Sequence, residues 1–581
     1  MVYLALFLAG GSKIYAQEAA SFGQKNNKAA LTNDVRQALT PKLLLENLKL
    51  PPATLTRLES RNAKVYIALR SNGRKLADAW SETTTGQAAI LEAANNAINQ
   101  LTPTLAPDTV ELVIAYDFKS ITFDAYKSHF SNIHRGINGI ELRYGTHQAR
   151  FSPTEMIANN LSFSKVINRF TDTHNLSKYQ LESDIELLGF SADQFLLNIG
   201  RQPYFTQLFR GNQTIGIESV TRMEVEKLAR RMSDWMIRNV DINGKMAYKY
   251  WPSNGQYSDA NNMIRQWMAS VCLIRISEFY NDQDIAALAE RNIQYNLEQF
   301  YQSAGSLGFI EFNGKAKLGS TALAALAIAD LPGSSSLSAY EAALRATIFH
   351  LWRDNGAFLT FLKPINRNDN QNFYPGEALV YLSKLQSITN DATLLMHLQR
   401  SIEYYRSWHL ENRNPAFIPW HTMAYAQIWQ QTRDPALSDW IFEMNDWLLG
   451  IQQNSSITNP DTVGRFYDPT RPQYGPPHAS ATGVYLEGLI QAYNIAKEIG
   501  DTKRASSYQS AILHGLRSLL QLEFNDDVDM YYISKPDHVY GGLRTTVYNN
   551  EIRVDNVQHG LMAILEVLKA FKDEDYAPSS L

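Results

Sequence analysis

The sequence has almost no cysteine. Cys272 is the only one in 581 residues, which excludes an intramolecular disulfide and a zinc site built from several thiolates. It lies within the apolar stretch 267–272, so we expect a buried core thiol rather than a nucleophile. No phosphate-cradling glycine-rich loop and no serine nucleophile elbow occur either. We therefore expect neither a metal nor a cofactor.

An excess of charge of one sign is also missing. The chain has 54 Lys and Arg against 58 Asp and Glu, a formal net charge of −4. This balance gives no electrostatic reason to expect nucleic acid or an anionic membrane as a partner. Aromatic residues, at 11% of the chain, would suit stacking on sugars or peptides, although large helical cores use them equally well.

Long hydrophobic runs are absent as well. The apolar run at residues 2–11 is too short to span a bilayer, so no integral membrane span is expected in the mature chain. With residues 14–16 it predicts a signal peptide over residues 1–16, although Lys13 follows the run where a basic residue should precede it. The alternatives are a start upstream of Met1 or a buried segment. Export without disulfides favours a bacterial periplasmic or secreted protein.

After a polar linker over residues 17–50, the pattern predicts an α+β domain over residues 51–215. Strands are expected near 63–69, 110–116, 139–145 and 185–190, with helices at 88–101 and 154–170. This order of elements, together with partial motif matches at residues 135–140 and 151–154, resembles the AMMECR-type α+β fold. The Arg-Gly-Cys-Ile-Gly signature of that family is absent, so no site is carried over. A structural or substrate-presenting role is expected.

From residue 216 to 575, helical periodicity dominates and strand signals nearly vanish. We expect twelve helices, near 218–239, 260–279, 283–302, 317–330, 337–353, 375–388, 391–410, 420–432, 435–453, 480–499, 501–522 and 554–573. Connections that leave even-numbered helices are short, whereas those that leave odd-numbered helices are long and rich in aromatic, proline and charged residues. Such hairpins display their long loops on one common face.

Six hairpins closed in a ring form an (α/α)6 toroid, so the expected fold class is a multidomain chain: an α+β domain followed by an all-α toroid. The small-residue stretch 321–329 predicts that even-numbered helices form the crowded inner ring. The alternative is an irregular α-solenoid.

At the level of architecture, the hairpin pattern resembles the six-hairpin superfamily of carbohydrate-active enzymes, which includes inverting glycosidases, uronate lyases and sugar epimerases. The resemblance implies a carbohydrate substrate and a site where the long loops enter the inner helices. Toroids such as lanthionine cyclases and protein prenyltransferases are excluded, because their zinc ligands include cysteine.

Candidate site residues stand at these helix starts. Before and within the second helix, Tyr257, Asn262 and Arg265 are candidates for substrate binding, and the last two share one helical face. Ser258 or Asp259 as an N-cap is the structural alternative at that end.

The sixth and eighth helices each begin with an aromatic residue beside a titratable one. Tyr374 precedes Glu377, a candidate catalytic carboxylate that the helix dipole would also favour for structural reasons. Trp420 precedes His421, a pair that could stack a sugar and shuttle a proton or could simply pack in the core.

The tenth helix contains the strongest catalytic candidate. Glu487 shares a face with Ser480 and Gly483, and a carboxylate inside a glycine-lined inner helix is costly unless it is paired or functional. His478, just before this helix, is a candidate for substrate binding.

Around the last helix, Asp555 is a candidate catalytic carboxylate and His559 a candidate for substrate binding on the same face. Arg544 and Arg553 could neutralise a carboxylated substrate. A structural cluster of Arg553 with Asp555 is the competing interpretation.

Three functions remain open from the sequence. The first is an exported glycoside hydrolase with two of Glu377, Glu487 and Asp555 as an acid/base pair, about 6.5–9.5 Å apart if the enzyme inverts. The second is a polysaccharide lyase or sugar epimerase that uses a histidine as base beside an arginine. The third is a non-catalytic glycan-binding or assembly protein. The first predicts two inward carboxylates in one cavity, and the second predicts two opposed imidazoles or a His–Tyr pair.

Overall fold

The computed structural model describes residues 48–102, 106–122, 124–177, 180, 184–199, 204–454 and 459–576. The predicted signal peptide (1–16) and nearly all of the predicted linker (17–50) lie outside these residues. By internal contacts, the described residues within 48–71, 75–116 and 195–206 form one compact unit, and those within 72–74, 117–194 and 207–576 form the other. The second unit therefore contains both the helical region and part of the predicted α+β domain.

The first unit is built on antiparallel strands covered by one helix. Strand β1 (Lys64–Ser71) pairs with β3 (Thr109–Ser120), and α5 (Gln87–Ile98) packs its alanine-rich face on them. In each of these two strands, every second side chain points into this core, as the period-two pattern of a strand predicts. They are Val65, Ile67 and Leu69 of β1 and Val110, Leu112 and Ile114 of β3. Strand β2 (Arg74–Trp80) and helix α4 (Pro52–Leu58) complete this part.

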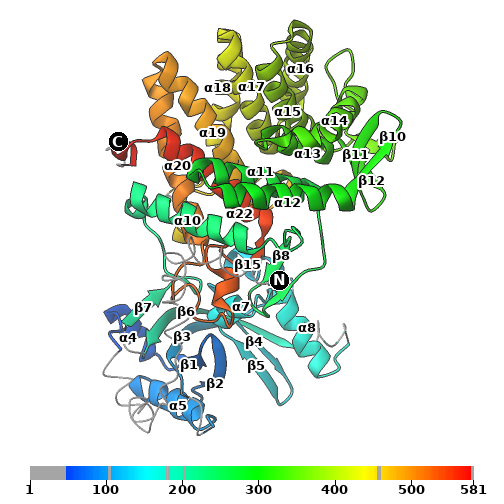
Figure 1. The fold of residues 1–581 in the computed structure, drawn as a ribbon. Helices are drawn as coiled ribbons and strands as arrows, with labels where there is room; N and C mark the ends of the chain where they lie inside the picture. Colours follow the sequence, from blue (N-terminus) through cyan, green and yellow to red (C-terminus); the bar gives the residue numbers. More distant parts are fainter. Residues whose placement is uncertain are drawn as a thin grey trace, which may run out of the picture. The chain divides into compact units, whose positions relative to one another are not determined.

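The remaining strands of the sheet are β4 (Gly139–Tyr144), β5 (His147–Phe151), β6 (Glu186–Asn198) and β7 (Tyr204–Leu208). The strand order is β2-β1-β3-β6-β4-β5, with β7 beside β6 (Figure 1). The single helix expected over 154–170 is wrong, because the chain forms α7 (Pro153–Ala158) and α8 (Phe163–Thr173) instead. Asn160 takes a positive φ of 49° between them, and the Ser162 hydroxyl caps α8 by accepting the Lys165 N–H.

In the described part of the second unit, six helices form a closed inner ring. They are α11 (Met263–Tyr280), α13 (Leu318–Asp330), α15 (Tyr374–Thr389), α17 (Ile418–Thr432), α19 (Ala479–Ile499) and α22 (Val554–Ala570). Each contacts the next, and α22 contacts α11. These are the even-numbered helices of the sequence prediction, which is confirmed. Because the ring closes, the solenoid alternative is wrong.

The outer layer consists of α10 (Arg222–Arg238), α12 (Gln283–Phe300), α14 (Ser338–Leu351), α16 (Ala392–Glu411), α18 (Pro435–Leu449) and α20 (Thr502–Leu522). Five of them follow their inner partner through a short turn, and α10 packs on α22 across the start and end of the ring (Figure 1). Asp and Asn residues cap several of these turns; Asp282, for example, accepts the N–H groups of Asp284 and Ile285.

The long loops contain two small sheets that the sequence analysis missed. One comprises β10 (Tyr301–Ala304), β11 (Leu307–Phe312), β12 (Lys315–Lys317) and β13 (Phe361–Lys363). The other comprises β14 (Arg544–Thr546), β15 (Asn549–Arg553), β8 (Lys249–Trp251) and β9 (Gln256–Tyr257). In the second sheet Ile552 pairs with Tyr250, so the lead-in to the last inner helix is hydrogen-bonded to the lead-in to the first.

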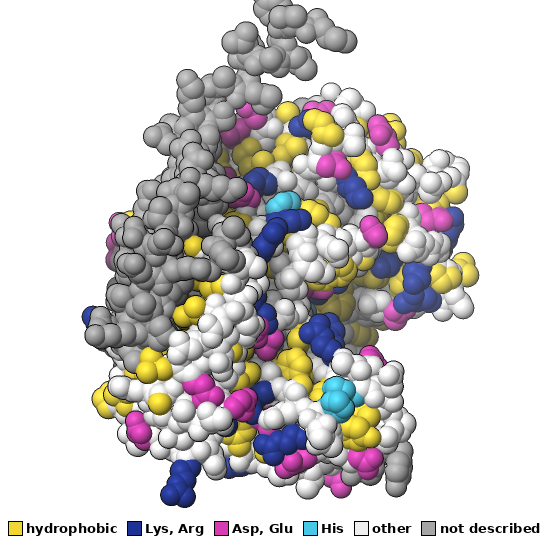
Figure 2. All heavy atoms as spheres, turned by 90° about the horizontal axis from the view of Figure 1, so that it is seen from below, with side chains coloured by type: hydrophobic (Ala, Val, Ile, Leu, Met, Phe, Trp, Pro, Cys, Tyr) yellow, Lys and Arg dark blue, Asp and Glu magenta, His cyan; other side chains and the backbone are white. Residues whose placement is uncertain are grey.

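No helix in the described residues has the length and apolarity needed to cross a membrane. On the face drawn in Figure 2, basic and acidic side chains of the described residues are interspersed among hydrophobic and uncharged polar groups.

Candidate active site

A cavity of about 870 Å³, partly open to solvent, lies where the long loops meet the inner helices. The first two turns of α11, α15, α17, α19 and α22 all contribute to its lining. The predicted site residues that line it are Arg265, Glu377, Trp420, His478, Asp555 and His559.

Glu377 lies in the first turn of α15 and is only 2% exposed. Its Oε2 atom has no hydrogen-bond partner among the described residues. Gly319 of α13 makes the room, because a Cβ there would lie 1.8 Å from Oε2. Burial raises the pKa of Glu377 to about 8, although Arg265 and Lys317 oppose this shift. The carboxyl group is therefore mostly protonated at neutral pH.

Asp555 is the opposite case. It lies at the start of α22, 1% exposed, and accepts hydrogen bonds from Arg265 Nε at 3.2 Å and Arg553 Nε at 2.8 Å. Burial by itself would raise its pKa, but the two guanidinium groups hold the pKa far below its usual range. Asp555 is consequently a permanent anion that positions Arg265 at the cavity wall. The expected cluster of Arg553 with Asp555 is present.

Glu487 and His559 form a dyad. His559 Nδ1 lies 2.6 Å from Glu487 Oε1, and both side chains are largely buried. A carboxylate can only accept, so Nδ1 carries a proton and donates to Glu487; in the tautomer with its single proton on Nδ1, Nε2 is an acceptor. His559 lines the cavity, whereas Glu487 stands behind it. This arrangement makes His559 a base that is supported by a carboxylate.

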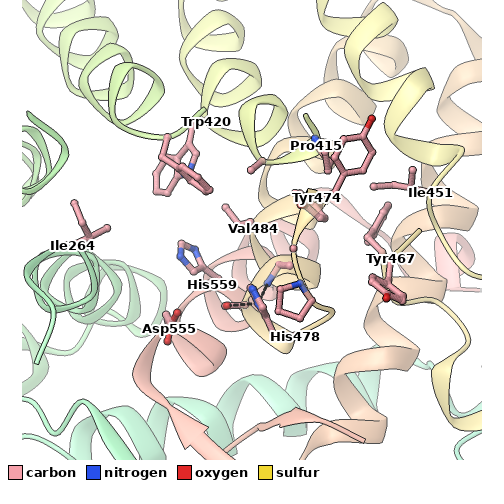
Figure 3. A pocket seen from close by; sticks show the side chains of 18 of the residues that line it. Ile264, Pro415, Trp420, Ile451, Tyr467, Tyr474, His478, Val484, Asp555 and His559 are labelled. Atoms are coloured by element: carbon pink, nitrogen blue, oxygen red, sulfur yellow. Dashed lines mark hydrogen bonds between the residues drawn. The ribbon is translucent and has the colours of Figure 1, made fainter. Parts of the chain in front are cut away.

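His478 shows the reverse tautomer. As the N-cap of α19, its Nδ1 accepts the Ala481 N–H at 3.0 Å and lies 2.7 Å from the Ser480 hydroxyl. The ring proton is therefore on Nε2. Burial lowers the pKa of His478 to about 4, with Arg553 contributing in the same direction. The cavity thus combines one imidazole that donates with another that accepts (Figure 3).

Aromatic side chains supply the rest of the wall. The Trp420 ring lies edge-on to His559, with centroids 5.9 Å apart, above the polar end of the cavity in Figure 3. Tyr467 and Tyr474 line the other side in Figure 3. Phe466 and Tyr485 also line the cavity, with ring centroids 5.5 Å apart. The sequence analysis did not identify these four residues, although the long aromatic loop between α18 and α19, which contains the first three of them in chain order, gave a signal.

Other predicted site residues do not line the cavity. His421, proposed as a base, is completely buried: its Nδ1 lies 2.9 Å from Phe417 O, and its ring stacks on Phe417 at 3.5 Å. Arg544 is also fully buried and contacts Asp529 and the carbonyl of Glu523. Both side chains are buried outside the cavity lining, and a catalytic role for His421 and a substrate-binding role for Arg544 stay predictions.

Three further candidates lie near the helix starts without lining the cavity. Asn262 caps α11 by accepting the Ile264 N–H, and Tyr374 packs beside Gly319. Tyr257 is 45% exposed, and its hydroxyl lies 3.0 Å from His538 Nδ1. Their roles in substrate binding stay predictions.

Among the described residues, no group of three or more His, Cys, Asp or Glu side chains is placed to hold a metal ion. The side chains that line the cavity can transfer protons directly. Glu377 supplies a protonated carboxyl group, His559 an imidazole hydrogen-bonded to Glu487, and His478 an imidazole with its proton on Nε2.

No family model matches the sequence, and no curated protein is significantly similar to it. Solved structures do resemble the fold. An α-1,6-mannanase variant from Salegentibacter sp. HEL1_6 matches 60% of this chain and all of its own, with 11% identity and a TM-score of 0.43. A D-mannose isomerase matches 60% of this chain and 98% of its own, with 12% identity and a TM-score of 0.46. An unsaturated glucuronyl hydrolase from Streptococcus agalactiae matches 62% and 99%, with 14% identity and a TM-score of 0.42.

The closed ring of helix contacts defines the helical region as an (α/α)6 toroid of the six-hairpin type. Its site is a partly open cavity with acid and base groups at the starts of the inner helices.

Proposed function

We propose that the toroid is a carbohydrate-active enzyme, and that its reaction is most simply glycoside hydrolysis. The observation that carries the proposal is the presence, in one cavity, of a protonated carboxyl at Glu377 and a carboxylate-backed base at His559. A sugar combines an apolar C–H face with hydroxyl groups, so it suits a cavity that places Trp420 beside these polar groups.

In hydrolysis, Glu377 would donate its proton to the glycosidic oxygen as the bond breaks. His559 Nε2 would accept a proton from the attacking water, and Glu487 would stabilise the imidazolium that forms. Asp555 is a weak proton acceptor because its pKa is far below neutrality, and its part is to fix Arg265. The three candidate carboxylates would therefore have different tasks: Glu377 donates the proton, Glu487 supports His559, and Asp555 positions Arg265.

A second candidate is a sugar epimerase or isomerase, favoured by the opposite tautomers of the two imidazoles. His559 Nε2 would remove a proton from a carbon next to a carbonyl group, and His478 Nε2–H would donate to the carbonyl oxygen. Arg265 lies between Asp555 and Glu377 and would hold the oxygen that becomes negative.

The test is incubation with a panel of bacterial oligosaccharides and monosaccharides, followed by mass spectrometry. Products heavier by one water indicate hydrolysis. Unchanged mass with deuterium uptake from heavy water indicates epimerisation or isomerisation, and an unsaturated product indicates a lyase. For hydrolysis, Glu377→Gln should lower kcat by about 10²–10⁴-fold, whereas the exposed Glu443→Gln should not change it. Binding of a sugar without turnover of any panel member would refute the enzymatic proposal.

The cellular location is part of the same proposal. Export to the periplasm or the cell exterior is inferred from residues 1–16 alone and can be tested by fractionating cells that express the full chain.

A further inference from the structure

A cluster of arginines lies apart from the catalytic groups, in the second unit. Arg135, Arg210, Arg465 and Arg517 are grouped with a single buried carboxylate, that of Asp461. Arg210 is the centre of the cluster at 1% exposure, with Nε donating to Asp461 Oδ2 at 2.6 Å. Buried charges are normally paired. The exposed Glu218 also acts on Arg517, but among the described residues four guanidinium groups with Asp461 and Glu218 still leave positive charge uncompensated.

Three of these arginines each have one buried nitrogen atom without a hydrogen-bond acceptor among the described residues. Arg210 Nη2, Arg135 Nε and Arg465 Nη1 are buried, and no described residue accepts a hydrogen bond from them. Other nitrogen atoms of these side chains do donate: Arg210 Nη1 to the Ile133 carbonyl at 2.9 Å, Arg465 Nε to Gln453 Oε1 at 2.7 Å, and Arg135 Nη2 to Asn160 Oδ1. Each guanidinium is therefore held in place while one N–H remains available. Buried donors of this kind require water or an ion.

Tyr548 connects the three guanidinium groups. The Arg210 guanidinium lies 5.9 Å from the Tyr548 ring, and Arg135 and Arg465 both interact electrostatically with the same phenol. Arg517 stands beside Asp461 and donates only to uncharged groups, namely the carbonyls of residues 215 and 463 and the Gln521 side chain. The excess positive charge of these arginines therefore lies around Tyr548 and Asp461.

The backbone supports a special role for Arg210. Arg210 and Gly211 form the centre of a tight turn between Phe209 and Asn212, with positive φ values of 55° and 70°. Asn, Asp and Gly are the residues usually found at the first central position of such a turn, because the left-handed conformation is unfavourable for a residue with a long side chain such as arginine. The turn directs this arginine into the interior against its own conformational preference.

We propose that Arg135, Arg210 and Arg465 bind a tetrahedral oxyanion of the sulfate or phosphate type beside Tyr548. A guanidinium fork matches the oxygen atoms of such an anion, and one anion would satisfy the three available N–H groups together. The site is distinct from the catalytic cavity but adjoins its wall. The Arg465 guanidinium lies 5.3 Å from the ring of Tyr467, which lines the cavity.

Burial and the neighbouring guanidinium of Arg210 both lower the pKa of Arg135, to about 10. Burial lowers the pKa of Arg465 as well. Both shifts accord with excess positive charge, which a bound anion would relieve.

Thermal unfolding of the full chain tests the site. In chloride buffer of constant ionic strength, sulfate or phosphate at low millimolar concentration should raise the unfolding midpoint saturably, by about 1–3 °C. Arg465→Gln should remove this response because it deletes one of the three donors. Arg406→Gln, on the exposed face of α16, should keep it. An equal, non-saturating rise in all three proteins would be a general salt effect and would overturn the proposal.

A crystal grown with selenate provides the second measurement. An anomalous peak within hydrogen-bond distance of Arg210 Nη2 is expected, and it should be absent from Arg465→Gln crystals. Ordered water at this position, with no anomalous peak in the wild-type crystal, would overturn the assignment even if Arg465→Gln failed to fold.

Discussion

The buried carboxyl of Glu377 gives a prediction that needs no knowledge of the substrate. Its folded-state pKa is raised to about 8 by burial, from an ordinary value of 4.5. Between these two values the folded chain holds a proton that the unfolded chain has released. Folding stability contributed by this group is therefore complete below pH 4.5 and is lost as the pH rises toward 8.

The size of the effect follows from linkage. One proton bound in the folded state and none in the unfolded state gives a slope of about −1.4 kcal/mol per pH unit. From pH 5.5 to 7.5 the loss is about 2.7 kcal/mol at this site. Because Glu377 is 2% exposed, solvent screening reduces this value little. Glu377→Gln keeps the size and polarity of the side chain but cannot ionise, so it should avoid the loss.

Urea unfolding of the wild type and Glu377→Gln at pH 5.5, 6.5 and 7.5, followed by tryptophan fluorescence, measures the difference. The stability of the variant relative to the wild type should grow by about 2–3 kcal/mol between pH 5.5 and pH 7.5. Glu443→Gln on the exposed face of α18 serves as the matched control and should track the wild type. A difference between wild type and Glu377→Gln that does not change with pH would refute the raised pKa and, with it, Glu377 as a proton donor at neutral pH.

Three further predictions follow from buried groups. Burial lowers the pKa of His421 from 6.5 to about 3, so this group should cost about 1.4 kcal/mol of stability per pH unit as the pH falls between these values. The stability of His421→Phe should fall less steeply with decreasing pH than that of the wild type, and an equal slope would contradict the lowered pKa. A Cβ on Gly483 would lie 2.5 Å from the Gly560 amide, so Gly483→Ala should force α19 and α22 apart, lower the unfolding midpoint and reduce turnover; thermal scans that match the wild type would show that the contact is not tight. Glu523 pairs with Arg231 at 2.6 Å in the interior, and Glu523→Leu should lower stability by about 3–5 kcal/mol in urea unfolding, whereas a loss below 1 kcal/mol would mean that water reaches Arg231.

The helices of the toroid could be predicted because their signals are local. The expected helices at 260–279 and 480–499 correspond to α11 (Met263–Tyr280) and α19 (Ala479–Ile499) within three residues at each end. Apolar periodicity, N-cap residues and the difference between short and long connections are all readable in short windows. Alternation of the connections placed the long loops at one end, and the small-residue stretch 321–329 placed the inner ring correctly.

The strands in the loops could not be predicted for the opposite reason. Strand β8 is three residues long and gains its hydrogen bonds from β15, about three hundred residues later in the chain. No short window contains both partners. The break between α7 and α8 was readable in principle, since two asparagines followed by an N-cap serine mark a helix end and a new start.

For the site, the sequence identified the helix starts but not the pairing of side chains. Trp420 and His421 are adjacent, so they project about 100° apart on α17; one reaches the cavity while the other stacks on Phe417 in the core. The dyad of Glu487 with His559 depends on the close contact of α19 with α22, which only the closed ring defines. The tautomers follow from these pairings and were beyond prediction.

The hydrogen bonds between β15 and β8, with the packing of α22 on α10 and α11, have a consequence for biosynthesis. A ribosome must synthesise the chain through α22 before the ring can close, and until then the largely buried helix α11 lacks one of the helices that cover it. A premature stop that removes only this last segment should therefore leave an incomplete circle and a chain prone to aggregation and degradation, rather than a slightly shortened protein.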